Sequence, residues 1–218
     1  MAQIFPKKAN DLVKVLAAAV VLGACGLGTM ATGLWLSPFI TQQDVAKQQV
    51  VPFSHLHHVK GLGIDCRYCH TTVETSSFAG IPPTETCMSC HSQIWTNAKM
   101  LEPVRASFKT QKPLEWLRVN DVPDFVYFNH SIHVNKGVGC VTCHGQVDEM
   151  ALTHKGQTLR MGWCLQCHRA PEQFLRPPSE VFNMQWQPPA DQSAKGLELV
   201  KNNHVKVEQL TNCSVCHR

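Results

Sequence analysis

The sequence predicts a mainly α-helical and irregular fold with little β-sheet, preceded by one N-terminal transmembrane helix. Three observations support this fold class. Ten of the 11 cysteines belong to five copies of one short motif between residues 66 and 217, residues 15–36 form an apolar run without a charge, and 13 prolines with 13 glycines interrupt the chain. The 218 residues suffice for one small domain and an anchor.

The transmembrane helix is predicted over residues 15–37. At about 1.5 Å per residue, its uncharged run can cross a bilayer core about 30 Å thick. Trp35 suits the outer interface of the membrane, and Pro38 ends the helix. Small residues recur four apart along it, a spacing that lets another membrane helix approach closely, for example at Ala19 and Gly23.

Positive charge before this helix predicts its orientation. Residues 1–14 are expected in the cytoplasm because they carry Lys7, Lys8 and Lys14. Residues 41–218 are then expected on the periplasmic, outer face of the inner membrane. The formal net charge is +4 with no basic run longer than Lys7-Lys8, so no nucleic-acid partner is expected.

Two alternatives to an uncleaved anchor concern its N-terminal half. A signal peptide has an apolar region of about 7–15 residues, shorter than this run. The stretch Leu22-Gly23-Ala24-Cys25 resembles a lipoprotein processing site, but apolar residues continue for eleven positions beyond it. An uncleaved anchor is therefore expected, with Cys25 as a small packing residue, and a modification of Cys25 stays open.

The repeated motif is C-x-x-C-H, the attachment signature of c-type haem. Two thiols three positions apart can form thioethers with the two vinyl groups of one haem, and the following histidine lies under the iron. Zinc ribbons need no histidine after each pair, and a disulfide scaffold would not space every pair identically. The sequence thus predicts five haem c groups, with thioethers at Cys66, Cys69, Cys87, Cys90, Cys140, Cys143, Cys164, Cys167, Cys213 and Cys216, and proximal iron ligands His70, His91, His144, His168 and His217.

Residues 41–218 also contain an internal repeat. The pattern F-x-H-x-x-H occurs at residues 53–58 and 128–133, and two C-x-x-C-H motifs follow each copy. We therefore expect di-haem units at about 53–91 and 128–168 and a terminal haem unit at about 191–218. The proline-rich residues 171–189 are expected to form an extended connector, and residues 191–206 have a weakly helical pattern.

An electron-transfer haem usually carries two axial protein ligands. The histidines of F-x-H-x-x-H resemble those of the small multihaem cytochromes of the c3 and c7 type, in which the first serves the haem attached just downstream and the second serves a different haem. This resemblance implies His55 and His130 as distal ligands of the haems at Cys66 and Cys140. It implies His58 and His133 as distal ligands of neighbouring haems, those at Cys87 and Cys164.

The fifth distal ligand has several candidates. Met161 stands three residues before Cys164, where the c7 type has the ligand of its last haem, and is preferred. His154 and His57 are alternatives, and Met184 and His204 are weaker ones. No motif ends in lysine in place of histidine, so a substrate-binding haem of the C-x-x-C-K kind is not expected. Electron relay is therefore favoured over catalysis at a haem, and no catalytic residue is predicted.

Longer phrases carry a closer resemblance. They are Gly63–His70 (GIDCRYCH), Thr84–His91 (TETCMSCH), Pro123–Gly145 (PDFVYFNHSIHVNKGVGCVTCHG) and Trp163–Arg169 (WCLQCHR). Together they resemble the pentahaem cytochrome subunits of alternative complex III, a bacterial quinol oxidase. The resemblance implies large membrane subunits that oxidise menaquinol, an iron–sulfur subunit beside them, and a monohaem cytochrome c, another soluble carrier or a terminal oxidase as acceptor.

Two other functions stay open from the sequence. One is a membrane-anchored multihaem quinol dehydrogenase that donates electrons to a periplasmic reductase. The other is a haem enzyme acting on a small substrate, which would need an iron with an open position. Seven histidines remain after the five proximal ones, enough candidates to fill every iron, and this disfavours the enzyme.

Overall fold

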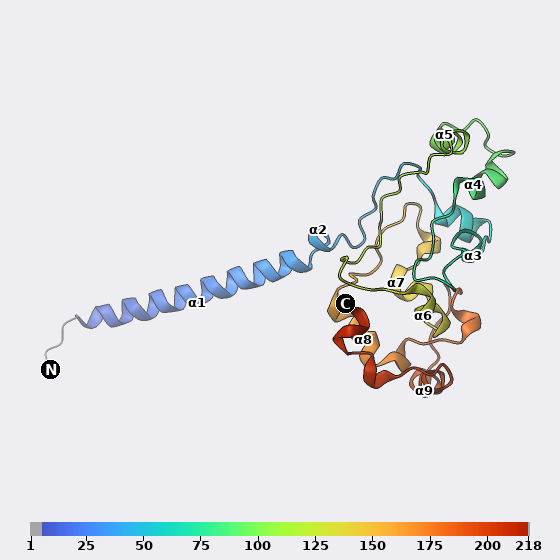
Figure 1. Ribbon diagram of the computed structural model, residues 1–218. Helices are drawn as coiled ribbons and strands as arrows, with labels where there is room; N and C mark the ends of the chain where they lie inside the picture. Colours follow the sequence, from blue (N-terminus) through green and yellow to red (C-terminus); the bar gives the residue numbers. More distant parts are fainter. Residues whose placement is uncertain (1–5, 218) are drawn as a thin grey trace. The chain divides into compact units, whose positions relative to one another are not determined.

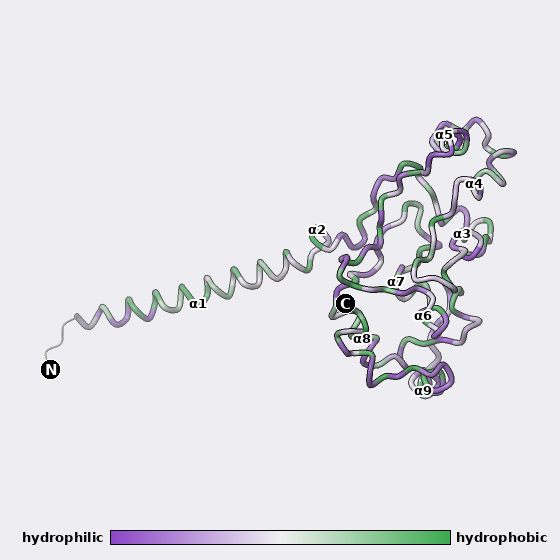
Figure 2. Tube along the Cα trace, viewed as in Figure 1, coloured by the Kyte–Doolittle hydropathy of each residue, from purple (hydrophilic) through white to green (hydrophobic). Residues whose placement is uncertain are grey.

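The computed structural model describes residues 6–217; residues 1–5 of the predicted cytoplasmic segment and Arg218 lie outside the described residues. The chain forms two compact units, Met1–Gln43 and Asp44–Arg218. The first contains a long helix, α1 (Lys7–Leu36), and one further turn, α2 (Pro38–Thr41). Figures 1 and 2 show α1 as a single helix on which apolar residues predominate after its first turns.

Residues Lys8–Thr41 are long and apolar enough to cross a membrane, by length and composition. α1 begins earlier than the apolar run that predicts it, because the polar residues before Val15 also suit a helix; Lys14 pairs with Asp11 at 3.5 Å. Ser37 is extended, with φ −69° and ψ 159°, and separates α1 from α2, which starts on Pro38.

The second unit consists of short helices joined by irregular chain (Figure 1). Its α-helices are α3 (Cys66–Cys69), α4 (Thr84–His91), α5 (Glu102–Thr110), α6 (His130–Asn135), α7 (Cys140–His144), α8 (Met161–Arg169), α9 (Gln192–Asn202) and α10 (Cys213–Cys216). One π-helical turn, η1 (Leu56–Gly61), and five 3₁₀ turns complete it: η2 (Lys99–Leu101), η3 (Val147–Glu149), η4 (Pro171–Gln173), η5 (Pro178–Glu180) and η6 (Val207–Gln209). Residues 6–217 form no β-strand, only isolated antiparallel bridges such as Val126 with His217. The predicted fold class is confirmed.

Each C-x-x-C pair lies on a helical turn, which places positions i and i+3 on one face. Cys66, Cys140 and Cys213 begin their helices, whereas Cys87 and Cys164 lie within α4 and α8. Local capping fixes two of the segments involved. Asp65 caps α3 by accepting a hydrogen bond from the Arg67 amide at 2.8 Å, and Asn129 caps α6 by accepting from the Ile132 amide at 3.2 Å.

The buried apolar core of the second unit is small. Eight hydrophobic side chains of the described residues are buried: Val51, Val73, Leu101, Val104, Met150, Leu175, Val181 and Met184. One cluster, Val51 with Leu101 and Val104, packs against Cys87 and Trp116, among others, and so joins α4 to α5.

The proline-rich residues 171–189 are not an extended connector, and this prediction is wrong. They form η4 and η5 and bury Leu175, Val181 and Met184. The prolines start the 3₁₀ turns, and the apolar residues between them pack inward. The predicted helical segment that follows is confirmed by α9, which packs on η4 where Gly196 lets the Glu172 carbonyl approach closely.

Candidate haem-binding sites

Three pairs of histidines lie close together in the second unit. His58 and His91 have ring centroids 6.2 Å apart, with 69° between their planes. His130 and His144 are 6.4 Å apart and 12° from parallel, and His133 and His168 are 6.2 Å apart at 30°. Each pair joins one predicted distal histidine to one predicted proximal histidine.

These separations fit one iron between each pair. A metal–imidazole bond is about 2.0 Å long and a ring nitrogen lies about 1.15 Å from the centre of its ring, so two imidazoles on opposite sides of one metal ion have centroids about 6.3 Å apart. The three observed separations lie within 0.1 Å of that value. The separations of these histidines therefore suit haem iron with two axial imidazoles.

Hydrogen bonds to the main chain orient most of these rings. A carbonyl oxygen can only accept, so an Nδ1 atom beside one must carry the proton, which leaves the lone pair on Nε2 for a metal. The Nδ1–H group of His58 donates to Ser54 O at 2.8 Å, and that of His133 donates to Asn129 O at 2.7 Å. The same interaction occurs at His130 with Ser77 O (3.0 Å), His70 with Gly80 O (2.7 Å), His91 with Ile94 O (3.3 Å), His168 with Leu210 O (2.9 Å) and His217 with Phe125 O (3.3 Å).

Burial keeps several of these imidazoles neutral, as metal binding requires. Desolvation, helped by neighbouring histidines, lowers the pKa of His55 and that of His144 to about 4. Desolvation also lowers the pKa of His58, His130 and His133, although a backbone hydrogen bond opposes the shift at each. An iron ion would therefore displace no proton from His55 or His144 near pH 7.

One phenylalanine in each repeat contacts both histidines of its F-x-H-x-x-H motif. Phe53 meets His55 edge to face at 4.9 Å and stacks on His58 at 4.4 Å. Phe128 meets His130 edge to face at 4.7 Å and stacks on His133 at 4.5 Å in the same way. The phenyl ring is thus the part of F-x-H-x-x-H that orients the two imidazoles.

His55 lies near its predicted partner His70, and the two interact electrostatically. The Nδ1 atom of His55 is 2.9 Å from the Thr153 hydroxyl, which belongs to the second repeat. His144 interacts electrostatically with His130, His70 and His55, so the predicted ligands of the first and third motifs gather in one region.

The fifth motif differs from the second, third and fourth. The His217 ring stacks on Phe125 at 5.8 Å, and no histidine ring of the described residues pairs with it. Met161, its preferred distal ligand, is 67 % exposed at the start of α8. α8 lies close by, because Cys164 interacts electrostatically with Cys216 and His168 donates to Leu210 O.

The other candidates lie in different surroundings. His154 turns Nε2 toward the Asp44 carboxylate at 3.8 Å. His57 is exposed and stacks on Trp95 at 5.9 Å. Met184 is buried at 3 % exposure, and His204 follows α9 with a φ of 51°. The distal ligand of the fifth motif stays a prediction.

The motifs follow one another in space in an order that differs from the sequence. The second motif lies beside the first, since Cys87 interacts electrostatically with Cys69 and Ser89 Oγ is 3.0 Å from the Tyr68 hydroxyl. On its other side the first motif neighbours the third, through Cys66 and Cys140.

The third motif continues to the fourth, because Cys143 interacts with Cys164 and Cys167. The fourth continues to the fifth through Cys164 and Cys216. Figure 1 shows α4, α3, α7 and α8 succeeding one another in the second unit. The spatial order is therefore second, first, third, fourth and fifth.

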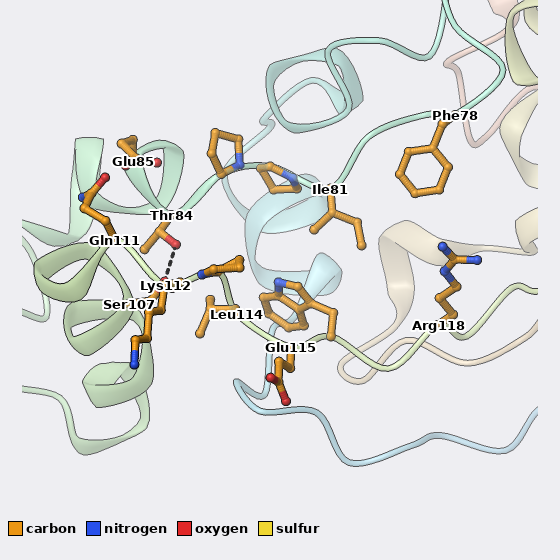
Figure 3. A pocket seen from close by; sticks show the side chains of 14 residues that line it. Phe78, Ile81, Thr84, Glu85, Ser107, Gln111, Lys112, Leu114, Glu115 and Arg118 are labelled. Carbon is orange, nitrogen blue, oxygen red and sulfur yellow. Dashed lines mark hydrogen bonds between the residues drawn. The ribbon is translucent and has the colours of Figure 1, made fainter.

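A separate open groove of about 630 Å³ lies beside the first turn of α4 (Figure 3). Phe78, Ile81 and Arg118 line one part of it, and Thr84 meets Ser107 across another with a 2.7 Å hydroxyl–hydroxyl hydrogen bond. The groove is lined by none of the predicted haem-binding residues. We therefore assign no haem to it.

Sequence reasoning missed the groups that orient the ligands. No pattern in the sequence indicates the carbonyl groups that accept from the histidines. Some of these carbonyls belong to distant segments; Leu210 O, which accepts from His168, is an example. No pattern indicates Thr153 beside His55 either. The phenylalanine that opens each F-x-H-x-x-H copy is repeated in the sequence, and this repetition is the signal that it orients the two histidines.

The chain is similar in sequence to known cytochromes. The family "Cytochrome c7 and related cytochrome c" matches residues 126–218, which include the second F-x-H-x-x-H and the last three C-x-x-C-H motifs. The chain is also 32 % identical over 161 residues to the multiheme cytochrome c subunit of menaquinone reductase from Nitratidesulfovibrio vulgaris, over 62 % of this chain and 74 % of that protein. The protein thus belongs to the multihaem c-type cytochromes, electron-transfer proteins that carry iron in covalently bound haem c.

Proposed function

We propose that this chain is the pentahaem electron-transfer subunit of a membrane quinol-oxidising complex of the alternative complex III kind. Bound haem c supplies reversible one-electron reduction of its iron. The chain's own residues hold five such groups in a row and fix the ligands on each. The carrying observation is the set of three histidine pairs, each with the separation that one iron requires.

The ligand assignment follows the pairs. We assign His58 with His91, His130 with His144 and His133 with His168 as axial pairs, and His55 with His70 as the fourth. Met161 with His217 is the fifth, and the thioethers are at the ten motif cysteines. In each repeat, two distal histidines three residues apart serve two different haems and so keep those haems adjacent.

The spatial order of the motifs gives the two ends of the proposed relay. The row ends at the second motif, beside α5, and at the fifth, near the C-terminus. Electrons would therefore enter at one of these two ends and leave at the other. A methionine ligand on the fifth haem would raise its potential relative to its bis-histidine neighbours and favour that end as the exit.

The link to a quinone rests on the relatives. The Nitratidesulfovibrio protein is named as a menaquinone reductase subunit, and the phrases around the motifs resemble the subunits of alternative complex III. We propose that α1 anchors the chain in the inner membrane with its N-terminus in the cytoplasm and residues 41–218 in the periplasm. Its partners would be integral membrane subunits that handle the quinone, an iron–sulfur subunit, and a monohaem cytochrome c or other electron acceptor.

A second candidate follows from the same relative. A menaquinone reductase runs electrons toward the quinone, so this chain could receive electrons from a periplasmic carrier and deliver them to the membrane. The anchored donor to a periplasmic reductase is the third arrangement. Mixing the complex as extracted with menaquinol and, separately, mixing its chemically reduced form with menaquinone shows which quinone form changes the haem spectrum; oxidation by menaquinone alone would favour this second candidate over the other two arrangements.

The haem assignment is tested by comparing His58→Ala with His57→Ala. We expect five haems per chain by pyridine haemochrome assay of the natural protein. His58→Ala should convert about one fifth of the ferric haem from low to high spin in the electron paramagnetic resonance spectrum, because His91 loses its partner. His57→Ala should leave the spectrum unchanged; a low-spin spectrum for both variants would refute the pairing.

Partners are tested by gentle detergent extraction followed by identification of the proteins that co-purify with the haem-stained chain. Large multi-helix subunits and an iron–sulfur protein would support the complex. Isolation of the chain alone, or with a periplasmic reductase only, would exclude it and favour the anchored donor.

A further inference from the structure

We propose that Arg176 is a buried positive charge, with no carboxylate in direct contact, that raises the reduction potential of the haem attached through Cys140 and Cys143. The inference rests on the proposed function, in which the third motif carries the central haem of the row. Arg176 was not singled out by the sequence, because it lies in the proline-rich segment between the fourth motif and α9.

Two close approaches fix the position of Arg176. Its backbone runs against the residues before the third motif, where the Arg176 amide donates to Gly137 O at 2.9 Å and Leu175 forms an antiparallel bridge with Val138. Its guanidinium occupies the space where residue 139 would carry a Cβ atom, so any larger residue at Gly139 would have to displace it. The charge therefore lies beside Gly139, the residue that directly precedes Cys140.

The guanidinium is buried without a full set of partners. Arg176 is 4 % exposed, and its ring neighbour is Trp186, whose centroid is 4.4 Å from Cζ. Nη1 donates to the carbonyls of Glu180 at 3.4 Å and Asn183 at 3.2 Å, whereas Nε has no partner among the described residues.

No carboxylate of the described residues lies within 4 Å of this guanidinium. Glu180 interacts with it from farther away, and the Glu180 carboxylate accepts a hydrogen bond from Asn183 Nδ2 at 2.7 Å. Arginine stays protonated in proteins, so the buried group is a cation. Burial of such a charge is unfavourable unless a negative charge or an added electron lies nearby.

Reduction of a nearby haem makes that haem one charge unit less positive. Fe(III) takes up one electron and becomes Fe(II), so the charge at the site falls by one, and no other bond or proton changes. A fixed cation close by favours the reduced state. Because the third motif stands in the middle of the row, Arg176 would make the central haem a better electron acceptor than it would otherwise be.

Two substitutions of Arg176 separate charge from shape in the full-length protein. Arg176→Met removes the charge, and Arg176→Lys keeps it while losing the planar group. With all five haems retained, we expect Arg176→Met to lower the electron affinity of one haem about tenfold, or about 59 mV for a one-electron couple, in a spectroelectrochemical titration. Arg176→Lys should shift it much less. An unchanged titration for Arg176→Met, or equal shifts for both variants, would overturn the proposal.

A third variant covers the case in which Arg176→Met fails to mature. Glu180→Gln removes the nearest negative charge but keeps an amide oxygen as acceptor for Asn183, so we expect the potential of one haem to rise; no rise overturns the proposal. Mass analysis of the peptide with Cys140 and Cys143 from the natural protein checks the premise separately. A peptide without haem would refute the proposed function at this motif, whereas a haem-bearing peptide with unmoved potentials would refute the role of Arg176 alone.

Discussion

The phenyl ring of Phe128 and the imidazole of His133 lie 4.5 Å apart, centroid to centroid, with 28° between their planes. Phe53 and His58 reproduce this relationship in the first repeat at 4.4 Å and 24°. The same phenyl rings also meet the earlier histidine of each motif edge to face. One side chain thus sets the direction of two imidazoles that we assign to two different haems.

Removal of the phenyl ring should disturb both of those haems. We expect Phe128→Ala to broaden the low-spin electron paramagnetic resonance signals of two haems, because a ring contact worth about 1 kcal/mol no longer orients His130 and His133. Phe128→Tyr retains the ring and serves as the control. Signals identical to the natural protein in Phe128→Ala would show that the backbone carbonyls alone orient the imidazoles.

The hydroxyl of Thr153 should influence the haem that we assign to His55. Thr153→Val keeps the shape of the side chain but removes the 2.9 Å partner of His55 Nδ1. Since a hydrogen bond to the second ring nitrogen tunes the basicity of a ligand, we expect the midpoint potential of one haem to change while its low-spin state persists. Thr153→Ser keeps the hydroxyl and should behave as the natural protein; equal titration curves for the valine and serine variants would contradict this role.

The fifth distal ligand is decided by two alanine variants. We expect Met161→Ala to abolish the weak long-wavelength absorption of a methionine-ligated ferric haem and to lower the potential of one haem. His154→Ala should change neither property, because its Nε2 faces Asp44 instead. If only His154→Ala altered the spectrum, His154 would replace Met161 in the assignment.

The packing of α9 on η4 depends on Gly196. A Cβ atom there would overlap the Glu172 carbonyl, so Gly196→Ala should force the two elements apart at about 1–3 kcal/mol. We expect a lower midpoint of thermal unfolding, followed by circular dichroism. Gly162→Ala, where a Cβ atom meets nothing within 4 Å, is the matched control and should change the midpoint little. Equal midpoints would mean that α9 can shift without cost.

The proposed membrane anchor should be separable from the rest of the chain. Asp44–Arg218 forms its own compact unit. If a cleavable export signal replaces residues 1–43, we expect a water-soluble cytochrome with the same haem content and the same visible spectrum. Haem staining of the soluble and membrane fractions measures this, and a product that stays in the membrane fraction would indicate a second attachment.

Features of the fold that depend on neighbouring residues could be predicted, and those that depend on contacts between residues far apart in the sequence could not. C-x-x-C-H specifies its geometry within five residues, and F-x-H-x-x-H places two imidazoles one helical turn apart, as at His130 and His133. The apolar run predicted α1, although its start at Lys7 depends on polar residues that carry no hydropathy signal. Such features are properties of neighbouring residues.

The spatial order of the motifs depends instead on tertiary contacts. Nothing near Cys87 in the sequence indicates that its motif ends the row, or that Cys66 neighbours Cys140. The prolines of residues 171–189 suggested an extended connector, yet the segment packs Leu175 and Arg176 against the third motif. Proline content restricts the backbone conformation of a segment. Whether its side chains are buried depends instead on the tertiary contacts that the segment makes.

The small polypeptide core bears on how the protein is made. The eight buried apolar side chains of the described residues cannot offset the conformational entropy of ordering more than 170 residues. Each covalent attachment must therefore also be a folding step, and a newly made chain without its prosthetic groups is an open substrate for proteases. We expect a cell starved of haem to degrade this chain rather than store an inactive form, so that its abundance follows the haem supply.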